Sequence, residues 1–416
     1  MHYLKFAFRN IFRYRTRSLV TIAVIFLGFT AVSAVGGMVN NIFSQLKAQA
    51  VVIEKLGHLT FAKEGFFLNG KMDPEAYIWN GKELKDIIDI IRQDSEVVLA
   101  TPRLKLFGVA SNGKASSIFL SEGIVPVDDA QLITTPIDGK MNTIGAVTLP
   151  QGENRQYEVA IGSELSAMLG VGEEQYFTLL TNTLDGMANA FDAKVAHVYN
   201  TGNPATNDKY VLINFSLAQQ LYDTNGAERI VVTLKNPERI EEIKNRLLQS
   251  ISQAGYNAEA YTWKELSLFY EKVTAMFSVI FGVLTIIISI VVLLVTLNTM
   301  LMAVTERTRE IGTLRSLGMQ QGNVIRLFCF EGLIMAFAGC LIALPVLFGI
   351  SEILEMLKVS FIPPVASSPV PILLKLSPEK LLIVFVLFTA AAVISSYLTS
   401  RKIAKQKVVD SLAHAN

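Results

Sequence analysis

A short charged stretch between two long apolar runs holds the side chains of this 416-residue chain that are best placed to contact a polar partner. Read as an α-helix, at about 100° per residue, this stretch (305–318) places Glu306, Arg309, Glu310 and Thr313 on one face. A helix held this closely between two membrane spans stays at the membrane surface, where its polar face can contact a soluble protein. The alternative is a solvated loop that only connects the two spans.

The same stretch has a second, more apolar face. Ile311, Leu314 and Gly318 share this face, with Arg307 at its N-terminal end and Arg315 on its far flank. Glycine directly after a helical run is a common helix stop, so the helix is predicted to end at Gly318.

The remaining residues that could do chemistry lack the spacing of a catalytic or metal site. Residues 65–72 imitate a phosphate-binding loop, but Met72 stands where a Ser or Thr would bind magnesium. The four histidines are scattered, without the spacing of metal ligands, and the sequence contains no Gly-x-Ser-x-Gly motif. Cys329 and Cys340 lie eleven positions apart, which is about 16 Å along a helix and too far for a disulfide. We therefore predict that the chain is not an enzyme and has no catalytic residue, cofactor or metal.

Four runs without Asp, Glu, Lys or Arg decide the protein class. They cover residues 18–46, 273–305, 332–351 and 381–400. Each reaches or exceeds the roughly 20 residues that a helix needs to cross a bilayer. The chain is 51% hydrophobic, with a mean hydropathy of +0.40, which is too apolar for a purely soluble protein. The sequence thus predicts four transmembrane helices.

The basic residues near these runs predict the orientation of the spans. They precede the first run, lie between the second and third, and follow the fourth: Lys5, Arg9, Arg13, Arg15, Arg17; Arg307, Arg309, Arg315, Arg326; Arg401, Lys402, Lys405, Lys407. Because positive residues remain on the cytoplasmic side, both termini are predicted to be cytoplasmic and the large segment after the first run external. A cleaved signal peptide is the alternative for the first run, which is longer than a typical signal-peptide core. The net charge of +1 argues against nucleic acid as a partner.

The segments that flank the spans have helical character of their own. Residues 4–13 alternate apolar and basic side chains, which is typical of an amphipathic helix at a membrane interface; the alternative is a disordered basic tail. Residues 46–50 extend the first run, and residues 263–270 lead into the second without Gly or Pro. We expect both to be continuous helical stalks that carry the external segment, with flexible linkers as the alternative.

The external segment is predicted to be a mixed α and β domain. Its periodicity and turn residues indicate helices at 81–93, 163–169, 215–223 and 237–253, and strands at 103–110, 115–120, 158–161, 175–181, 193–199, 210–213 and 229–234. Ser163 is expected to cap the second of these helices. Between the third and fourth spans, four prolines in residues 361–371 exclude a helix; this loop is either a rim that faces the substrate or a rigid connector.

The ordered motif Glu306-Arg307-Thr308-Arg309-Glu310-Ile311-Gly312, followed by Leu314-Arg315 and Leu317-Gly318, resembles the signature of the FtsX-like ABC permease family, which includes the MacB, LolC and LolE types. Ser316 and Met319 replace two alanines of the usual pattern. In this family the segment is the coupling helix that docks on a separate ATPase. The resemblance implies that the docking residues are Glu306, Arg307, Arg309, Glu310, Ile311, Leu314, Arg315 and Gly318. Residues 159–162, 169–170 and 261–266 resemble, less specifically, the periplasmic domain of MacB- and LolC-like proteins.

Small and polar residues inside the spans are candidates for helix packing. Gly332, Ala336 and Gly339 or Cys340 form a small-residue row on the third span, and Ala391 with Ser395, like Ala392 with Ser396, does so on the fourth. Such rows let helix backbones approach each other, although small residues are common in any span. Glu331 lies at the cytoplasmic entrance of the third span, where the family pattern also carries Glu. It should face protein or water because a carboxylate is costly in hydrocarbon; the alternative is that it only extends into the lipid headgroups.

The predicted fold is an α-helical integral membrane protein with four transmembrane helices and a large mixed α+β extracytoplasmic domain between helices 1 and 2. Its expected parts are an amphipathic helix (1–17), a span with outward stalk (18–46), the α+β domain (47–262), a second stalk and span (263–305), the coupling helix and its loop (306–325), a third span (326–351), an external loop (352–380), a fourth span (381–400) and a cytoplasmic tail (401–416).

The resemblance implies an inner-membrane permease subunit that works with two copies of an ABC-type ATPase and a second permease, identical or homologous. Four spans without a charged channel favour mechanical transmission over solute passage. The expected function is release or export of a lipoprotein or other amphiphile from the inner membrane, so membrane lipid is an expected partner. Alternatives are MacB-like efflux with a periplasmic adaptor, FtsX-like control of a cell-wall hydrolase and, from a different class, a membrane-anchored sensor of a periplasmic ligand.

Overall fold

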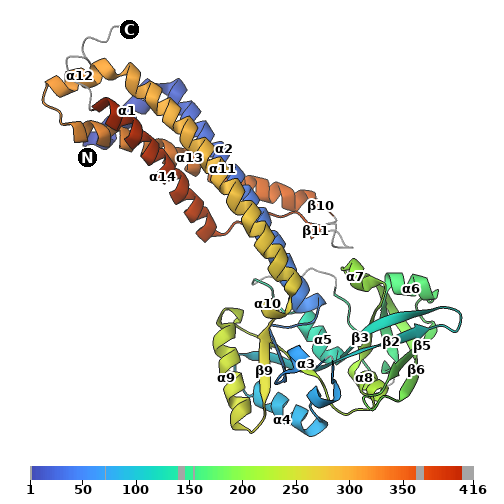
Figure 1. Ribbon diagram of the computed structural model, residues 1–416. Coiled ribbons are helices and arrows are strands. Elements are labelled where there is room, and N and C mark those ends of the chain that lie inside the picture. The colour runs from blue at the N-terminus through green and yellow to red at the C-terminus, as the bar shows by residue number, and fades with distance from the viewer. Residues whose placement is uncertain (1, 71, 139–145, 153–154, 362–369, 405–416) are drawn as a thin grey trace. The chain divides into compact units, whose positions relative to one another are not determined.

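The computed structural model describes residues 2–70, 72–138, 146–152, 155–361 and 370–404 (Figure 1). The chain divides into two compact units. We call residues 1–42, 274–359 and 371–416 the helical unit, and residues 43–273 and 360–370 the α+β unit. Most of the Pro-rich segment 361–371 lies outside the described residues, so the prediction made for it is not addressed; the short strands β10 (Ser360–Phe361) and β11 (Val370–Pro371) flank it.

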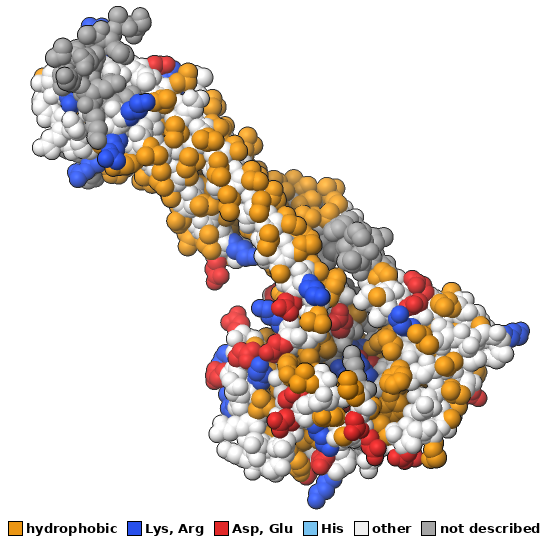
Figure 2. Space-filling view, viewed as in Figure 1, with side chains coloured by type: hydrophobic (Ala, Val, Ile, Leu, Met, Phe, Trp, Pro, Cys, Tyr) orange, Lys and Arg blue, Asp and Glu red, His pale blue; other side chains and the backbone are white. Residues whose placement is uncertain are grey.

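Four helices of the described chain are long and apolar enough to cross a membrane. They are α2 (Arg15–Ala48), α11 (Leu268–Glu306), α13 (Gln321–Leu357) and α14 (Pro378–Ala404). The helical unit also contains the shorter α1 (His2–Arg13) and α12 (Thr308–Ser316). Hydrophobic side chains cover the outer surface of the long helices (Figure 2), as expected for contact with lipid. The predicted four transmembrane helices are confirmed.

Close packing of small residues holds α13 to its neighbours in the helical unit. A Cβ added to Gly332 would overlap Ser396 Oγ of α14, and one added to Gly339 would lie 3.0 Å from the carbonyl oxygen of Ile22 in α2. Ala336 is fully buried in the shared core. On α14, Ala391 is buried, and the hydroxyl of Ser395 donates to the carbonyl of Leu293 in α11 at 3.1 Å.

The α+β unit is built on nine strands in the order β3-β7-β4-β6-β5-β2-β8-β1-β9, with a further pairing of β3 with β2. Six of them therefore form a closed ring of pairings: β2 (Val97–Ser111), β3 (Ser116–Ile124), β4 (Glu158–Gly162), β5 (Tyr176–Asn182), β6 (Ala188–Tyr199) and β7 (Tyr210–Asn214). The long β2 leaves the ring and pairs through its first half with β8 (Arg229–Leu234), which is followed by β1 (Leu59–Lys63) and β9 (Ala258–Thr262).

Helices cover both parts of this sheet. α6 (Ser163–Leu169) and α8 (Phe215–Tyr222) bury Leu165 and Leu217 in the core of the ring. α4 (Gly81–Arg92) and α9 (Ile240–Gln253) pack over β1, β8 and β9. The shorter helices are α3 (Phe66–Asn69), α5 (Pro126–Ile133), α7 (Pro204–Asn207) and α10 (Trp263–Leu266), with single turns at Gln49–Ile53, Glu75–Tyr77 and Pro237–Arg239.

Two predictions about helix starts are wrong. The stretch 263–270 is not one helix with the second span: α10 ends at Leu266, the backbone of Ser267 is not helical (φ −89°, ψ 79°), and α11 starts at Leu268. The Ser267 hydroxyl oxygen accepts from the Tyr270 amide at 3.4 Å, as an N-cap does. A new helix therefore begins after Ser267, although this stretch contains neither Gly nor Pro. In α6 the N-cap is Gly162 rather than Ser163, whose hydroxyl instead accepts from Asn207 at 3.0 Å.

Candidate functional site at the α11–α13 connector

The connector between α11 and α13, residues 307–320, contains the nine-residue helix α12. The helix begins after Arg307, and the hydroxyl of Thr308 donates back to the Thr305 carbonyl at 2.6 Å. At the other end, the amides of Leu317 and Gly318 donate to Thr313 and Arg315 carbonyls. Gly318 has a φ of +97°, a conformation that favours glycine, and the chain leaves the helix there.

One face of α12 is turned inward and packs on the chain itself. Ile311 is 4% exposed and belongs to an apolar cluster with Val304 of α11, Val324 and Phe328 of α13 and Ala404 of α14. Thr308 is buried as well. Burial of an isoleucine stabilises this packing by about 1.5–3 kcal/mol. The side chain of Ile311, one of the predicted docking residues, is therefore taken up by internal contacts.

Arg307 is the centre of a buried polar cluster on the same side. Its Nη1 donates to both carboxylate oxygens of Glu331, at 3.0 and 3.2 Å, and Asn10 Nδ2 of α1 donates to Glu331 Oε1 at 2.7 Å. The guanidinium also lies over the rings of Tyr14 and Phe328, with its carbon 5.5 and 5.0 Å from the ring centres. Glu331 thus faces protein, and removal of either charge would leave the other buried without its partner.

Partly exposed ion pairs surround this cluster. Glu310 accepts from Arg307 Nε at 3.4 Å and pairs with Arg13 of α1 at 3.3 Å, while Glu306 pairs with Arg17 of α2. Ion pairs that water reaches contribute about 0–1 kcal/mol each, so these contacts can exchange for others at small cost. Both acidic residues of the predicted docking face have partners within the chain.

The other face of α12 is open. Arg309, Thr313, Ser316 and Leu317 are exposed, and Leu317 is 80% exposed. Arg309 forms no ion pair with any side chain that the structure describes. Arg315 is half-buried. The side chain of Leu314 lies outside what the structure describes.

The residues of the N-terminal helices that reach this site were not predicted as part of it. Asn10, Arg13, Tyr14 and Arg17 recur at intervals of three or four, the spacing of one helical face, and this periodicity was the available signal. Three of these residues, Asn10, Tyr14 and Arg17, line a cavity of about 30 Å³ together with Thr21, Arg307 and Glu331. The volume and the polar side chains within the lining suit bound water.

Comparison with known proteins gives matches over most of the chain. Residues 18–250 match the family model described as MacB-like periplasmic core domain, and residues 280–408 match the one described as FtsX-like permease C-terminal. The chain is 24% identical over 198 residues to the macrolide export ATP-binding/permease protein MacB of Chromobacterium violaceum, covering 47% of this chain and 29% of that protein.

Two further relatives carry different names. The identity is 29% over 178 residues to the pyoverdine export ATP-binding/permease protein PvdT of Pseudomonas fluorescens, covering 42% of this chain and 24% of the relative. It is 25% over 140 residues to the uncharacterised ABC transporter permease YknZ of Bacillus subtilis, covering 33% and 35%. The chain therefore spans about a third or less of the length of these curated relatives.

Proposed function

Because the chain belongs to the family of FtsX-like ABC transporter permeases with a MacB-like periplasmic core domain, we propose that it transmits force from an ABC-type ATPase to the α+β unit. In this proposal α12 is the coupling helix and is docked on the ATPase, which another polypeptide supplies. Two ATPase chains and two permeases, identical or homologous, form the working assembly. The chain is a multi-pass membrane protein; we propose that it resides in the inner membrane, with both termini cytoplasmic and the α+β unit periplasmic.

The open face of α12 carries the proposal. Leu317 is 80% exposed at the end of this helix, and Arg309 is exposed without an ion pair to any described side chain. Together they offer an apolar anchor and a charge to a soluble partner. Anchors of this kind contribute about 2 kcal/mol or more each when a partner buries them. We propose that Leu317 and Arg309 dominate docking, assisted by Thr313 and Ser316.

The inner residues of the motif have a different role in this proposal. Arg307 and Ile311 hold α12 against α1, α13 and α14, and Glu306 and Glu310 tie it to Arg17 and Arg13. A push from the ATPase on the open face would then reach the long helices through these contacts instead of bending a loose loop.

Co-purification with the ATPase tests docking. Leu317→Asp and Arg309→Glu should each lower recovery of the ATPase at least about tenfold, since loss of an interface anchor costs about 2 kcal/mol or more. Lys402→Glu, an exposed charge reversal at the end of α14, is the matched control and should leave recovery unchanged. Parent-like recovery with both connector variants would contradict the proposal. Binding of a cytoplasmic ATPase also requires the connector to be cytoplasmic.

An exposed apolar surface on the α+β unit bears on the substrate. Phe107 of β2 is paired with Leu120 of β3, and in the next row Val109 is paired with Ile118 and with Leu180 of β5. All five side chains are exposed; Phe107 and Ile118 are 64% and 65% exposed. Exposed apolar patches mark sites that bind apolar ligands or partners. We propose that this surface receives a lipoprotein or other amphiphile extracted from the outer leaflet.

Export of a small amphiphile through a periplasmic adaptor is the second candidate, since two of the relatives are named for macrolide and pyoverdine export. A photo-crosslinking residue at Phe107 or Ile118 separates the two. Crosslinks to acylated proteins support lipoprotein release, whereas crosslinks to one periplasmic protein without an acyl chain support the adaptor. A residue at Lys82, exposed on α4, is the control position.

A further inference from the structure

The segment that follows α2 has an unusual backbone. We call residues 49–58 the junction segment. It starts with a π-helical turn, Gln49–Ile53, whose wide pattern continues in hydrogen bonds from the Leu56 amide to Ala50 and from the Gly57 amide to Val51. Lys55 has a φ of +54°, in the left-handed region that a residue with a side chain rarely adopts. Such a conformation persists only when the surroundings hold it in place.

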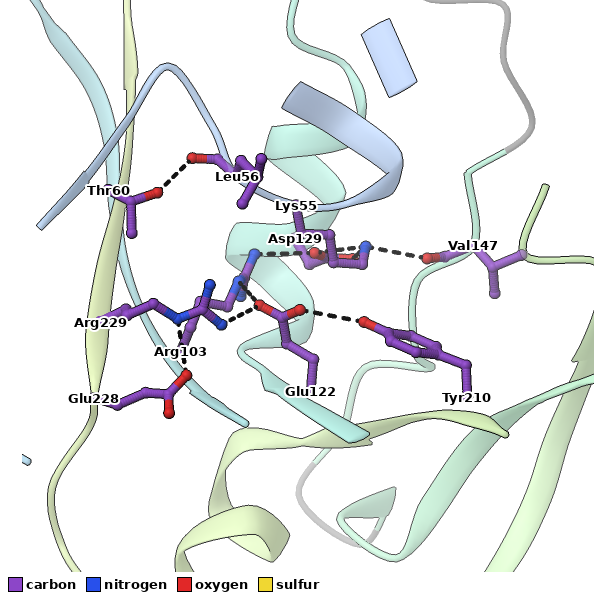
Figure 3. A network of polar contacts seen from close by, with 10 residues as sticks. All are labelled: Lys55, Leu56, Thr60, Arg103, Glu122, Asp129, Val147, Tyr210, Glu228 and Arg229. Atoms are coloured by element: carbon purple, nitrogen blue, oxygen red, sulfur yellow. Dashed lines mark hydrogen bonds and ion pairs between the residues drawn. The ribbon is translucent and has the colours of Figure 1, made fainter. Parts of the chain in front are cut away.

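Lys55 is held by a buried carboxylate. Its Nζ donates to Asp129 Oδ1 and Oδ2 of α5 at 2.9 and 2.7 Å, and to the carbonyl of Val147 at 3.4 Å (Figure 3). The two side chains are 5% and 0% exposed. Burial lowers the pKa of Lys55 and the charge of Asp129 opposes this shift.

The pair continues into the sheet. Arg103 Nη2 of β2 donates to Asp129 Oδ1 at 3.1 Å, and its Nε lies 3.9 Å from Glu122 Oε1 of β3. Arg229 Nη2 of β8 donates to the same Glu122 oxygen at 3.1 Å. Figure 3 shows the chain of contacts from the lysine to both arginines, with two further links: Tyr210 donates to Glu122 at 3.2 Å, and Arg229 Nε to Glu228 at 2.8 Å.

Stability alone does not explain this network of three cations and three carboxylates. Buried charges lose their hydration, and a well-packed apolar set of similar volume is often as stable or more stable by about 1–4 kcal/mol. Arg103 and Arg229 are direct cross-strand partners, an unfavourable pairing of like charges that Glu122 compensates. Charged pairs differ from apolar contacts in being directional, because their hydrogen bonds form at one geometry.

The rest of the junction segment is attached by contacts of two kinds. Val51, Val52 and Leu56 pack with Trp263 in an apolar cluster, whose contacts are not directional. His58 is bonded directionally: its amide donates to the Val232 carbonyl at 2.8 Å, and its Nδ1 accepts from the Leu234 amide at 2.9 Å. Lys55 and His58 thus attach the segment to the sheet at two points three residues apart.

We propose that the Lys55–Asp129 pair is a rigid joint that fixes the junction segment to β2, β3 and β8. Displacement of the chain at the end of α2 then moves the sheet as one body instead of being absorbed in the segment. Lys55 and Asp129 are positioning residues in this inference, which rests on the proposed force-transmitting function. The network belongs wholly to the α+β unit.

Spin-label distances across the joint test the proposal in the full-length chain with its ATPase. Labels replace Gln49 and Asp192, an exposed residue of β6, after removal of the native Cys329 and Cys340. In the parent the distance between the labels should be equal in the nucleotide-free and vanadate-trapped states. In Lys55→Met the distance distribution should differ between the two states, and amide exchange at Glu54, Leu56 and Gly57 should be at least about tenfold faster.

Lys47→Met is the matched control, because Lys47 also pairs with an aspartate, Asp138, but this pair is partly exposed at 22% and 42%. It should behave like the parent. Lys55→Arg keeps the charge and should restore part of the rigidity. If Lys55→Met does not fold, Asp129→Asn, which is isosteric, provides the comparison.

A parent distance that changes between the two states, or Lys55→Met and Asp129→Asn variants that match the parent in distance and exchange, would overturn the joint. Amide exchange in the absence of ATPase distinguishes this failure from failure of the proposed function. The joint predicts faster exchange in Lys55→Met whether or not the ATPase binds.

Discussion

The helical unit and the α+β unit each contain a buried network built on an Arg–Glu pair, and the two networks differ in whether they reach water. Arg307 and Glu331 in the helical unit, like Arg229 and Glu122 in the α+β unit, are side chains less than about a tenth exposed that join segments distant in sequence. The first network continues outward to Glu310, which is 41% exposed, and the separate pair of Glu306 with Arg17 lies beside it, with Glu306 47% exposed. The second network ends in the interior of the sheet. A network that reaches water can exchange partners; an enclosed one cannot.

This difference suits the two roles that we propose for the connector and the joint. A connector that receives a push must adjust when its partner binds, and exposed pairs exchange at a cost of about 0–1 kcal/mol. A joint that passes the push on must not yield, and loss of one partner from a buried pair costs about 3–5 kcal/mol. Burial alone would raise the pKa of Glu122, yet Arg229, with Lys105, Arg103 and Lys55, holds this pKa below its ordinary value. Glu122 is therefore charged in the folded protein.

The largest expected effect comes from the carboxylate that the two arginines share. Glu122→Leu leaves Arg103 and Arg229 facing each other and should lower the free energy of unfolding of the α+β unit by roughly 3–5 kcal/mol. Both tryptophans of the chain, Trp79 and Trp263, belong to this unit, so urea unfolding followed by tryptophan fluorescence measures it. Glu242→Ala removes an exposed pair with Arg239 and is the control. Equal effects of the two variants would erase the distinction between enclosed and exposed networks.

A pH dependence of similar size is expected from His58. Burial, with a smaller effect of the Lys47 charge, lowers the pKa of its imidazole from 6.5 to about 4. The folded state therefore binds fewer protons than the unfolded state between these values, and stability is lost as the pH falls from about 6.5 to about 4. The loss should approach roughly 3 kcal/mol.

The same tryptophan signal, recorded in urea at several pH values, measures this dependence. His58→Gln should flatten the profile between pH 6.5 and 4, because the titrating group is gone. If the free energy of unfolding of the parent does not change across this pH window, His58 is either protonated or exposed to solvent in the folded protein.

A smaller effect is expected in the helical unit. Glu331→Gln keeps a hydrogen-bond acceptor for Arg307, and Glu310 offers a second carboxylate at 3.4 Å, so stability should fall by roughly 1.5–3 kcal/mol. Both cysteines lie in this unit, and Cys340 is fully buried. The temperature at which a fluorogenic thiol reagent gains access to Cys340, in a variant without Cys329, therefore reports its unfolding.

The double variant Arg307→Met with Glu331→Met removes both charges and should recover much of that stability while impairing stimulation of the ATPase. Glu331→Gln variants that unfold at the parent temperature would mean that the connector does not depend on this pair. A loss as large as that of Glu122→Leu would mean that the network near the surface is no more adaptable than the enclosed one.

Local patterns in the sequence determined much of this protein. Charge-free runs predict the four spans because a bilayer demands about 20 apolar residues in a row. The stripe of Leu84, Ile87, Ile88 and Ile91 predicts α4, and these side chains are buried. The ordered motif around Glu306 predicts the permease family, which the family matches confirm.

Other elements follow no local pattern. β1 (Leu59–Lys63) and β9 (Ala258–Thr262) were not predicted; β1 is placed by pairing with β8 on one side and with β9 on the other. Likewise, the face of α12 that turns inward was decided by Phe328 and Glu331, which lie beyond the helix in sequence. The motif alone does not separate docking residues from those that pack inside.

The buried network was decided by tertiary structure alone. Lys55, Arg103, Glu122 and Asp129 read as surface residues in the sequence, because hydropathy counts each charge as if it faced water. Lys55 and Asp129 lie 74 positions apart in the sequence, and Arg229 and Glu122 lie 107 positions apart. A charge can leave water only when an opposite charge meets it, and that meeting depends on the folded path of strands that share no local sequence pattern.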